Sequence, residues 1–453
     1  MCAAHNFVEL AIRSRRENDI YMKNLFELIA QKKAAVGIIG QGYVGLPLAV
    51  EFARAGFRVT GFEVDPKKVA SLNAAKSYVD DIEDAALAPL VEADLLRCTS
   101  DFAELNSQDA VIICVPTPLR KSKDPDVSYI VSSAESIRKH MRRGQLIVLE
   151  STTYPGTTTE LVKPMLEASG LKTGRDFYLA FSPERVDPGN PNFGIVNTPK
   201  VVGGETETCT KLAAALYGAI VERVLPVSNT RAAELVKLLE NTFRAVNIGM
   251  VNEFALMCDR LDLNVWEIVD AAATKPFGYM PFYPGPGIGG HCIPLDPHYL
   301  GWKMKTLNFE PRFIELAGTI NSNMPAYVVS RLYRTLNEAG KCMSKSSVLV
   351  MGVTYKADIS DPRESPAMDV ISLLTKTGAK VDYHDAYVKE FAVDGKKLVS
   401  KKLSPAMVKK YDCVLILTAH KCVDYKALVA QAKLVFDTRN ATRGIRSKKI
   451  VRL

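Results

Sequence analysis

The sequence predicts an α/β protein in which two doubly wound, Rossmann-like domains are joined by a helical middle domain. Strand and helix patterns alternate from Ala34, give way to long helical stretches near residue 229, and resume near residue 340. The length of 453 residues is about three times that of a typical domain. We therefore expect a helical leader at 1–33, a first Rossmann-like domain at 34–228, a central helical domain at 229–339 and a second Rossmann-like domain at 340–453.

The composition is that of a globular protein, with 47% apolar and 24% charged residues, which excludes a disordered or collagen-like chain. The chain has no run of eighteen apolar residues and no signal-peptide pattern, so we expect no membrane span and a cytoplasmic location. The nine cysteines form no CxxC pair and no zinc-finger spacing, so no metal site is expected.

Each predicted element follows from a local pattern. In the leader, Leu25, Phe26, Leu28 and Ile29 form one apolar stripe of a helix over 21–31, which we interpret as a docking surface. In the first domain a helix is expected over Leu46–Ala55. Short apolar runs predict the strands Ala34–Ile39, Phe57–Glu63, Ala110–Val115, Leu146–Leu149, Phe177–Phe181 and Lys200–Val202.

The middle domain is expected to contain two long helices, Asn229–Asp262 and Pro311–Ala339, separated by a loop rich in glycine and proline, Phe277–Pro297. In the last domain a helix is expected over Pro366–Thr377. Strands are predicted at Val348–Val353, Lys380–His384, Val414–Thr418 and Leu434–Asp437. The final fifteen residues carry six Lys and Arg residues, beginning with Arg439, and we interpret them as a solvated basic tail rather than a phosphate-binding edge.

A dinucleotide-binding fingerprint opens the first domain. The sequence Gly40-Gln41-Gly42-Tyr43-Val44-Gly45 follows a predicted strand and begins a predicted helix, where free N–H groups bind a pyrophosphate. Glu63, at the end of the next strand, suits both hydroxyls of a ribose and would repel a 2′-phosphate, which favours NAD over NADP. Asp65 is the alternative ribose ligand, and Lys68 is either on the adenosine side or on the surface.

Two further strand ends belong to the same crevice, since ligands of open α/β sheets gather beyond the carboxyl ends of the strands. Thr117, in the VPTP segment, and Thr152, in the EST segment, are candidate ligands of the nicotinamide side or ordinary turn residues. Glu184 and Arg185 follow another strand in an SPER segment, where Glu184 could serve as a general base or position a water.

The glycine-rich loop contains the candidate nucleophile, Cys292. Asp296-Pro297 is a favourable helix start, with Asp296 as the cap, and a helix N-terminus stabilises a thiolate just before it. A structural cysteine is the alternative. Lys237 and Asn241 lie one turn apart on the preceding long helix, so they share a face that points either to solvent or into a site.

Taken together, these segments resemble the UDP-glucose/GDP-mannose (nucleotide-sugar) dehydrogenase family from about Ala34 to the end of the chain. The motifs are GxGYVGLPLA at 40–49, VPTP at 115–118, EST at 150–152, SPER at 182–185, KLLENTFRAVN at 237–247, PGPGIGGHCIPLDP at 284–297 and YKADISDPRESPA at 355–367.

The resemblance implies that NAD oxidises the sixth carbon of a UDP-sugar twice, to a uronic acid. Cys292 would capture the aldehyde as a thiohemiacetal, which becomes a thioester and is then hydrolysed. Lys237 would stabilise oxyanions, Asn241 would bind the same oxygen, and Asp296 would position water or transfer protons. Glu184 and Arg185 would line the substrate region.

The resemblance further places nucleotide recognition in the last domain. Lys356 matches a lysine that contacts substrate and Arg363 an arginine that reaches the NAD site, although each could be a solvated loop charge. Tyr283 and Gly289 would line the substrate channel. A homodimer or higher oligomer is implied, with the Pro311–Ala339 helix as the expected interface. The net charge of +8 suits these two phosphate-bearing ligands better than nucleic acid.

Departures from the family pattern bear on the substrate. Leu295, Pro188 and Ala357 stand where UDP-glucose enzymes often carry Lys, Glu and Lys. The segments 77–79, 281–286 and 312–317 instead resemble UDP-N-acetyl-D-glucosamine 6-dehydrogenases, which feed polysaccharide biosynthesis. UDP-N-acetyl-D-glucosamine is therefore the expected substrate, followed by UDP-N-acetyl-D-mannosamine and UDP-glucose. A two-electron NAD dehydrogenase and a non-catalytic NAD-binding scaffold are the alternatives outside this reaction.

Overall fold

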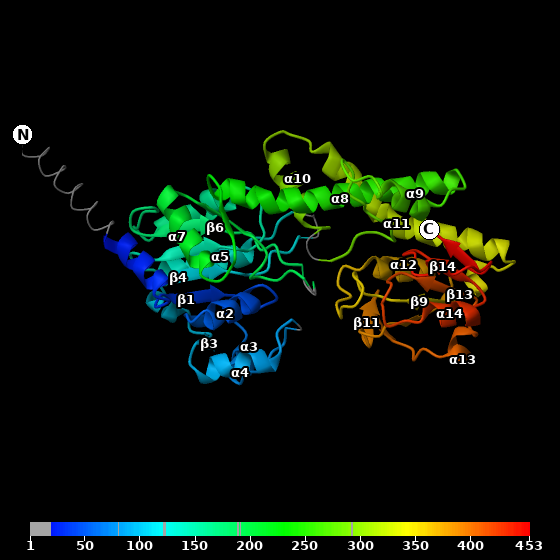
Figure 1. Ribbon diagram of the computed structural model, residues 1–453, viewed down its shortest axis with the longest axis horizontal. Helices are drawn as coiled ribbons and strands as arrows, with labels where there is room; N and C mark the ends of the chain where they lie inside the picture. The colour runs from blue at the N-terminus through cyan, green and yellow to red at the C-terminus, as the bar shows by residue number, and fades with distance from the viewer. Residues whose placement is uncertain (1–19, 80, 121–123, 188–189, 191, 291–292) are drawn as a thin grey trace, which may run out of the picture. The chain divides into compact units, whose positions relative to one another are not determined.

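The computed structural model describes residues 20–79, 81–120, 124–187, 190, 192–290 and 293–453. The chain divides into two compact units, one up to Glu240 and one from Asn241 to Leu453. Both are α/β, which confirms the predicted class (Figure 1). The partition into a leader and three domains stays a prediction.

The first unit is built on an eight-stranded sheet in the order β3-β2-β1-β4-β5-β6-β7-β8. Only the β6–β7 pair is antiparallel among its neighbouring strands. The order reverses between β1 and β4, which is the position where doubly wound sheets bind ligands. The strands are β1 (Ala35–Ile39), β2 (Arg58–Phe62), β3 (Leu96–Thr99), β4 (Ala110–Ile113), β5 (Leu146–Leu149), β6 (Tyr178–Phe181), β7 (Lys200–Gly204) and β8 (Val224–Pro226).

Helices cover both faces of this sheet because its central strands are apolar throughout. One core contains side chains of α2 (Gly45–Arg54), α3 (Pro66–Asn73), α4 (Asp84–Glu92) and α7 (Glu207–Gly218). The other contains side chains of α5 (Ser128–His140), the π-helix η2 (Thr157–Val162) and α6 (Lys163–Glu167).

The leader is helical over residues 20–30. Leu25 and Ile29 are buried in the first core, and Phe26 and Leu28 pack against it. The predicted docking role of this apolar stripe is confirmed.

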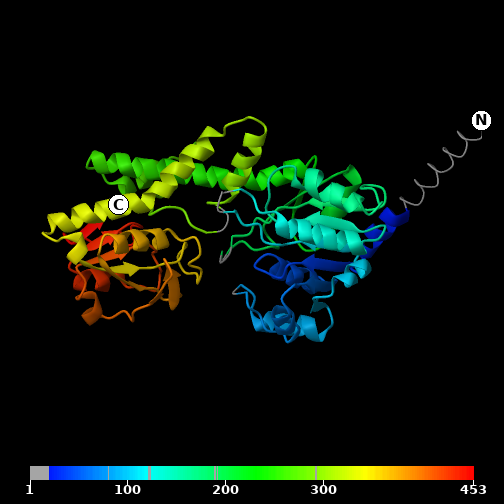
Figure 2. The same cartoon turned by 180° about the vertical axis from the view of Figure 1, so that it is seen from behind.

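The second unit contains a parallel five-stranded sheet in the order β10-β9-β13-β14-β15, with a separate hairpin, β11–β12 (Figure 2). Its order reverses at β9, so this sheet also has a switch point. The strands are β9 (Ser347–Met351), β10 (Lys380–His384), β11 (Glu390–Val393), β12 (Lys396–Val399), β13 (Cys413–Ile416), β14 (Val435–Asp437) and β15 (Ile450–Arg452). Helix α12 (Pro366–Lys376) packs into one core, and α13 (Pro405–Val408) and α14 (Tyr425–Gln431) border the other.

Two long helices agree with the predicted stretches. Helix α8 (Thr230–Arg260) begins in the first unit and ends in the second, and α11 (Arg312–Glu338) lies in the second with α9 (Val265–Ala272) and α10 (Asp296–Thr306). The prediction that Asp296 caps α10 is wrong, since Leu295 holds the cap position and Asp296 is the first helical residue. None of the described helices is long and apolar enough to cross a membrane.

Candidate active site

The glycine fingerprint lies at the switch point of the first sheet, directly after β1. Gly40 has a φ of +90°, and a side chain there would lie 2.6 Å from the carbonyl oxygen of Cys114. A side chain at Gly45, the first residue of α2, would lie 1.8 Å from the carbonyl oxygen of Gly40. At Gly42, by contrast, nothing lies within 4 Å of the added carbon. Gly40 and Gly45 are therefore fixed by packing, whereas Gly42 keeps the approach to the helix N-terminus open.

Glu63 fits the ribose role better than Asp65. Its buried carboxylate lies beyond β2 and accepts the backbone N–H groups of Gln41, at 3.3 Å, and of Asp65, at 3.2 Å. The Asp65 side chain instead accepts the N–H of Lys67 and caps α3. The Glu63 carboxylate therefore faces the glycine turn, whereas the Asp65 carboxylate caps helix α3.

The other predicted cofactor residues surround this turn. The ammonium of Lys68 lies 5.3 Å from the ring centre of Tyr78, whose hydroxyl donates to the carbonyl of Gln41 at 2.7 Å. Tyr43 is about half exposed, and Val44 holds the position before α2. Lys68 is thus tied to the fingerprint through Tyr78 rather than being a detached surface lysine.

Thr152 meets the predicted catalytic lysine. The ammonium of Lys237, on α8, donates to Thr152 Oγ1 at 2.5 Å. The neighbouring Ser151 donates to the carbonyl of Val115 at 2.8 Å, which joins the EST segment to the segment that carries Thr117. Lys237 therefore points at the carboxyl edge of the first sheet, so the alternative of a solvent-facing lysine is not supported.

A buried charge cluster lies beside this edge. The ammonium of Lys200, at the start of β7, contacts the carboxylates of Glu150 and of Glu184, the latter at 3.0 Å. The hydroxyl of Tyr217 donates to Glu150 at 2.5 Å. Glu184 also accepts the N–H groups of Arg185 and Val186. The predicted site residue Glu184 is therefore held on every side by this chain.

The pKa values of the two carboxylates of the cluster, Glu150 and Glu184, are shifted in opposite directions. Burial raises the pKa of Glu150 to about 7, although Lys200 opposes the rise. Burial would also raise the pKa of Glu184, but the charge of Lys200 and the N–H of Val186 outweigh it and lower this pKa to about 2. Glu184 is a fixed anion at neutral pH and a very weak base, which favours a water-positioning role over proton abstraction.

Arg185 is engaged elsewhere. Its guanidinium forms an ion pair with Glu240 on α8, with Nη2 and Oε1 2.6 Å apart, and donates to the carbonyl of Pro199 at 2.5 Å. In the structure, Glu184 thus belongs to the charged cluster, whereas Arg185 contacts helix α8. A role of Arg185 in substrate binding stays a prediction.

In the second unit, Asn241 and Asp296 form a buried pair. The Asn241 amide donates to the Asp296 carboxylate at 2.6 Å, and the two residues are 8% and 2% exposed. Asp296 is the first residue of α10, four positions after Cys292. Cys292 and His291 themselves lie outside the described residues.

The glycine loop before Cys292 is packed tightly against the second sheet's loops. A side chain at Gly289 would lie 2.6 Å from the carbonyl oxygen of Glu364, and one at Gly290 would lie 2.9 Å from the ring of Tyr355. The N–H of Gly285 donates to the buried amide of Asn252 at 3.0 Å. Gly289 therefore has a packing role, whatever its part in a substrate channel.

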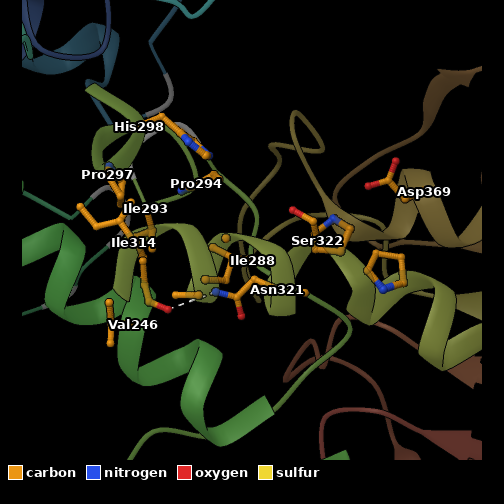
Figure 3. Close-up of a pocket in the computed structure, with 16 residues that line it drawn as sticks. Val246, Ile288, Ile293, Pro294, Pro297, His298, Ile314, Asn321, Ser322 and Asp369 are labelled. Atoms are coloured by element: carbon orange, nitrogen blue, oxygen red, sulfur yellow. Dashed lines mark hydrogen bonds between the residues drawn. The ribbon is translucent and has the colours of Figure 1, made fainter. Parts of the chain in front are cut away.

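A cavity of about 160 Å³ lies behind this loop (Figure 3). The Asn321 amide on α11 lines the cavity and donates to the carbonyl of Ala245 on α8 at 3.1 Å. The other wall residues come from α8, the glycine loop, α10, α11 and α12, and they include Val246, Gly287, Ile288, Ile293, Pro294, His298, Ser322 and Asp369. The glycine loop therefore forms part of the wall of a small cavity within the second unit.

Three predicted substrate or cofactor residues have local partners. The Tyr283 hydroxyl donates to Asp270 at 2.9 Å, and its ring stacks on Trp266. The Arg363 guanidinium forms two hydrogen bonds to the Asp361 carboxylate, of 2.9 and 2.8 Å. The backbone carbonyl of Lys356 accepts a hydrogen bond from Thr354. Their predicted contacts with ligands stay predictions.

The sequence analysis missed Arg439 by treating it as part of a solvated tail. The structure buries most of it at the end of β14, where its Nε donates to the carbonyl of Leu417 at 3.0 Å. Burial lowers its pKa to about 10. Its guanidinium lies so close to Gly285 that a side chain there would be 2.4 Å away. Its position at the carboxyl end of a strand could have identified it. Lys200 was also missed, although a lysine at the start of the apolar strand β7 is an unusual position that could have drawn attention to it.

Comparison with known proteins decides the family. The NAD binding, central and UDP binding domain models of the UDP-glucose/GDP-mannose dehydrogenase family match residues 34–221, 231–323 and 349–444. The chain belongs to the UDP-glucose/GDP-mannose dehydrogenase family. This confirms the predicted family, the NAD cofactor and an NAD-dependent nucleotide-sugar dehydrogenase.

The similar members of this family include enzymes that are named for two different substrates. A UDP-N-acetyl-D-mannosamine dehydrogenase of Pyrococcus horikoshii is 33% identical over 89% of this chain and 95% of its own. A UDP-N-acetyl-D-glucosamine 6-dehydrogenase of Pseudomonas aeruginosa is 36% identical over 79% and 84%. The solved structure of the Pyrococcus horikoshii UDP-D-ManNAc dehydrogenase has a TM-score of 0.84, with 32% identity, and covers 92% of this chain and 98% of its own.

Proposed function

We propose that this dehydrogenase oxidises a UDP-N-acetylhexosamine, with UDP-N-acetyl-D-glucosamine as the preferred substrate, at its sixth carbon to the uronic acid. The observation that carries the proposal is the buried Asn241–Asp296 pair, in which Asp296, the first residue of α10, follows Cys292 by four positions in the sequence. An amide and a carboxylate held together at this point of the chain can bind oxygens of the reacting carbon.

The first unit fits NAD. Gly42 leaves the approach to the N-terminus of α2 open, and the Glu63 carboxylate faces the same turn. Tyr43, Val44, Lys68 and Thr117 are the other proposed NAD contacts of this unit, and Arg363 is proposed as a further NAD contact. Bound NAD supplies a hydride acceptor for each of two oxidations, so one uronic acid is formed with two NADH.

The chain's own groups perform the remaining steps. The Cys292 sulfur, as a thiolate, adds to the aldehyde carbon, and the new alkoxide takes up one proton to give a thiohemiacetal. After the second oxidation, water attacks the thioester carbonyl, the carbon–sulfur bond breaks, and the thiol and the carboxylic acid are released. Lys237, held against Thr152, and Asn241 stabilise the alkoxide in these steps.

The hydrolytic step needs an oriented water. Glu184 is a permanent anion that Lys200 and two backbone N–H groups hold in place, so it can accept a hydrogen bond from water but takes a proton poorly. Asp296 is the better candidate for the proton transfer because it lies closest in sequence to Cys292. Arg185, Tyr283, Gly289 and Lys356 complete the proposed substrate region.

The choice of sugar rests on sequence. Leu295 and Ala357 depart from the lysines of UDP-glucose enzymes, and relatives named for N-acetylhexosamine substrates are 33–36% identical. These relatives include both UDP-N-acetyl-D-glucosamine and UDP-N-acetyl-D-mannosamine enzymes. The mannosamine epimer is therefore the second candidate.

We further propose that the enzyme is a cytoplasmic homodimer that pairs through α8 rather than through the predicted α11. Helix α11 buries Ala317, Met324 and Val328 within the second unit. On α8, exposed apolar residues recur at spacings of four and three, at Met250, Phe254 and Met257. That spacing is the pattern of helices that pair side by side. The free state of the seven described cysteines agrees with a reducing compartment.

The test is the yield of NADH from a panel of UDP- and GDP-sugars. The proposal expects turnover with UDP-N-acetyl-D-glucosamine and two NADH per sugar acid. Faster turnover of the mannosamine epimer would change the substrate and keep the mechanism. A yield of one NADH with a free aldehyde or ketone would refute the thioester route, and NAD binding without turnover of any sugar would support a non-catalytic scaffold.

A further inference from the structure

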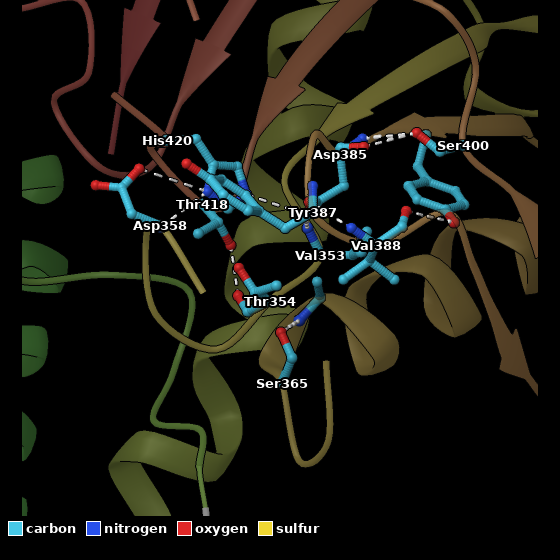
Figure 4. Close-up of polar contacts among 12 residues, drawn as sticks. Val353, Thr354, Asp358, Ser365, Asp385, Tyr387, Val388, Ser400, Thr418 and His420 are labelled. Atoms are coloured by element: carbon cyan, nitrogen blue, oxygen red, sulfur yellow. Dashed lines mark hydrogen bonds and ion pairs between the residues drawn. The ribbon is translucent and has the colours of Figure 1, made fainter. Parts of the chain in front are cut away.

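A buried histidine lies beneath the carboxyl edge of the second sheet. His420 follows β13, is 2% exposed, and contacts the carboxylate of Asp385, which follows β10 (Figure 4). The two strands flank β9 on its two sides. His420 and Asp385 therefore meet under the switch point of the sheet that matches the UDP binding domain.

The partners of the ring fix its tautomer. Asp385 accepts the backbone N–H groups of Val353, Tyr387 and Val388. Burial would raise the pKa of Asp385, but the bond to His420 and these N–H groups lower it, so the carboxylate is ionised and His420 Nε2 must donate to it. On the other side, His420 Nδ1 lies 3.0 Å from the backbone N–H of Asp358 and must accept it. These two contacts make Nε2 the donor and Nδ1 the acceptor of the ring.

Through Nδ1 the ring holds the segment 354–358, which contains Lys356. The same segment is fixed at two more points, because Thr418 donates to the carbonyl of Thr354 at 2.6 Å and Lys421 N–H donates to Asp358 Oδ1 at 2.9 Å. Asp358 has a φ of +63°, a backbone conformation that a non-glycine residue keeps only when its surroundings impose it. The hydrogen bond to His420 is one of the contacts that impose it.

The segment also touches the glycine loop. A side chain at Gly289 would lie 2.7 Å from Cβ of Tyr355, and one at Gly290 would lie within 3.0 Å of the Tyr355 ring. The position of 354–358 is thus coupled by packing to the residues that precede Cys292.

We propose that His420 is a positioning residue of the nucleotide-sugar site, which holds the segment 354–358 in the conformation that binds the UDP moiety. The inference rests on the proposed function, since it takes the UDP-sugar as the ligand. His420 touches no substrate atom in this role and acts through the Asp358 N–H. Its loss should therefore weaken UDP binding and raise the KM for the UDP-sugar more than it lowers kcat.

The experiment uses the full chain and compares three substitutions at His420. In His420→Asn, the shorter amide can place an acceptor near the position of Nδ1. In His420→Gln, the amide reaches toward Nε2 and leaves the Asp358 N–H unpaired, and His420→Leu removes both polar atoms. His384→Asn is the matched control, because that histidine is at the end of β10 and contacts the carbonyl of Lys401 instead of the segment.

Calorimetric titration with UDP and, separately, with NAD gives the readout, together with KM and kcat. We expect UDP binding about tenfold weaker in His420→Leu and His420→Gln, because a buried N–H is left without a partner. His420→Asn should restore most of the affinity, His384→Asn should match the parent, and NAD binding should be unchanged throughout.

Unchanged UDP binding in His420→Leu, or equal losses for UDP and NAD, would overturn the inference. If the leucine variant does not fold, the order of the other two decides, since the inference requires the asparagine variant to bind UDP more tightly than the glutamine variant. A parent protein that binds no UDP would refute the proposed function itself and, with it, the role given to His420.

Discussion

The ammonium of Lys200 lies 3.0 Å from the carboxylate of Glu184 and contacts Glu150 on its other side, where solvent hardly reaches. One buried cation therefore serves two carboxylates that come from the ends of β5 and β6. Removing the cation would leave two like charges facing each other in a medium of low polarity.

Lys200→Met should lower the free energy of unfolding by about 3–5 kcal/mol, as expected when one partner of a buried ion pair is deleted. Urea denaturation measures it. Lys163→Met is the control, because Lys163 pairs with Glu205 at 2.9 Å but is one-third exposed, and its loss should cost less than about 1 kcal/mol. Equal effects of the two substitutions would contradict the special position of Lys200.

Glu234 should make the stability fall as the pH rises from 4.5 to about 7. Burial raises its pKa from 4.5 to about 7, against the opposing hydrogen bonds from Gly156 and Thr158. In this window the unfolded chain has lost the proton that the folded chain keeps, so folding is favoured below pH 4.5 and loses up to about 3 kcal/mol by pH 7.

Glu234→Gln should flatten that dependence when unfolding is followed at a series of pH values. The difference between the two proteins isolates Glu234, since the other titrating groups are common to both. Parallel stability curves for the parent and the variant would show that Glu234 is ionised in the folded state.

Lys237→Met should reduce kcat about 10²- to 10³-fold and leave NAD binding intact, because the lysine stabilises an anion that exists only during the reaction. Thr152→Val removes the acceptor that holds the ammonium in place and should cause a smaller loss. The double variant should be no slower than Lys237→Met, since both substitutions remove the same hydrogen bond between Lys237 and Thr152. Additive losses in steady-state kinetics would mean that the two residues act separately.

Cys292→Ser should abolish uronic acid formation while NAD still binds. A thiolate captures an aldehyde at neutral pH, whereas a serine hydroxyl remains protonated and is a poor nucleophile. Cys422→Ser is the control, because Cys422 is free and exposed. Product formation by the first variant at the parental rate would remove the cysteine from the mechanism.

Phe254→Glu should convert the dimer into monomers in sedimentation experiments. The residue lies at the centre of the apolar stripe on α8, and a charge there would be desolvated in a paired interface. Phe313→Glu introduces the same charge on an exposed position of α11 and should leave the dimer intact. The reverse result would return the interface to α11.

The sequence predicted best the elements that are buried on both faces. Strand β5 begins and ends where predicted, since a buried parallel strand is a short apolar run. The hairpin β11–β12 was missed because its two strands have four residues each, are largely exposed, and show no apolar run or regular alternation. Its pairing depends on contacts that local composition does not reveal.

The site could be predicted in its parts but not in its pairings. Glycine spacing and strand ends located the fingerprint and Glu63, because local geometry requires those residue types. Lys200 and Arg439 were missed because charge ordinarily indicates exposure, and their surroundings come from distant segments, as with Glu150, fifty positions from Lys200. Asp296 was mistaken for a cap because its actual partner, Asn241, lies on another helix.

Arg439 is a desolvated positive charge at the end of β14. Its largely buried guanidinium forms no ion pair with any carboxylate of the described chain. An anion that binds this guanidinium in the folded state, and not in the unfolded chain, shifts the unfolding equilibrium toward the folded state by mass action. The free energy of unfolding would therefore rise with the concentration of any anion that occupies this position, and fewer molecules would be unfolded and open to proteolysis at any moment.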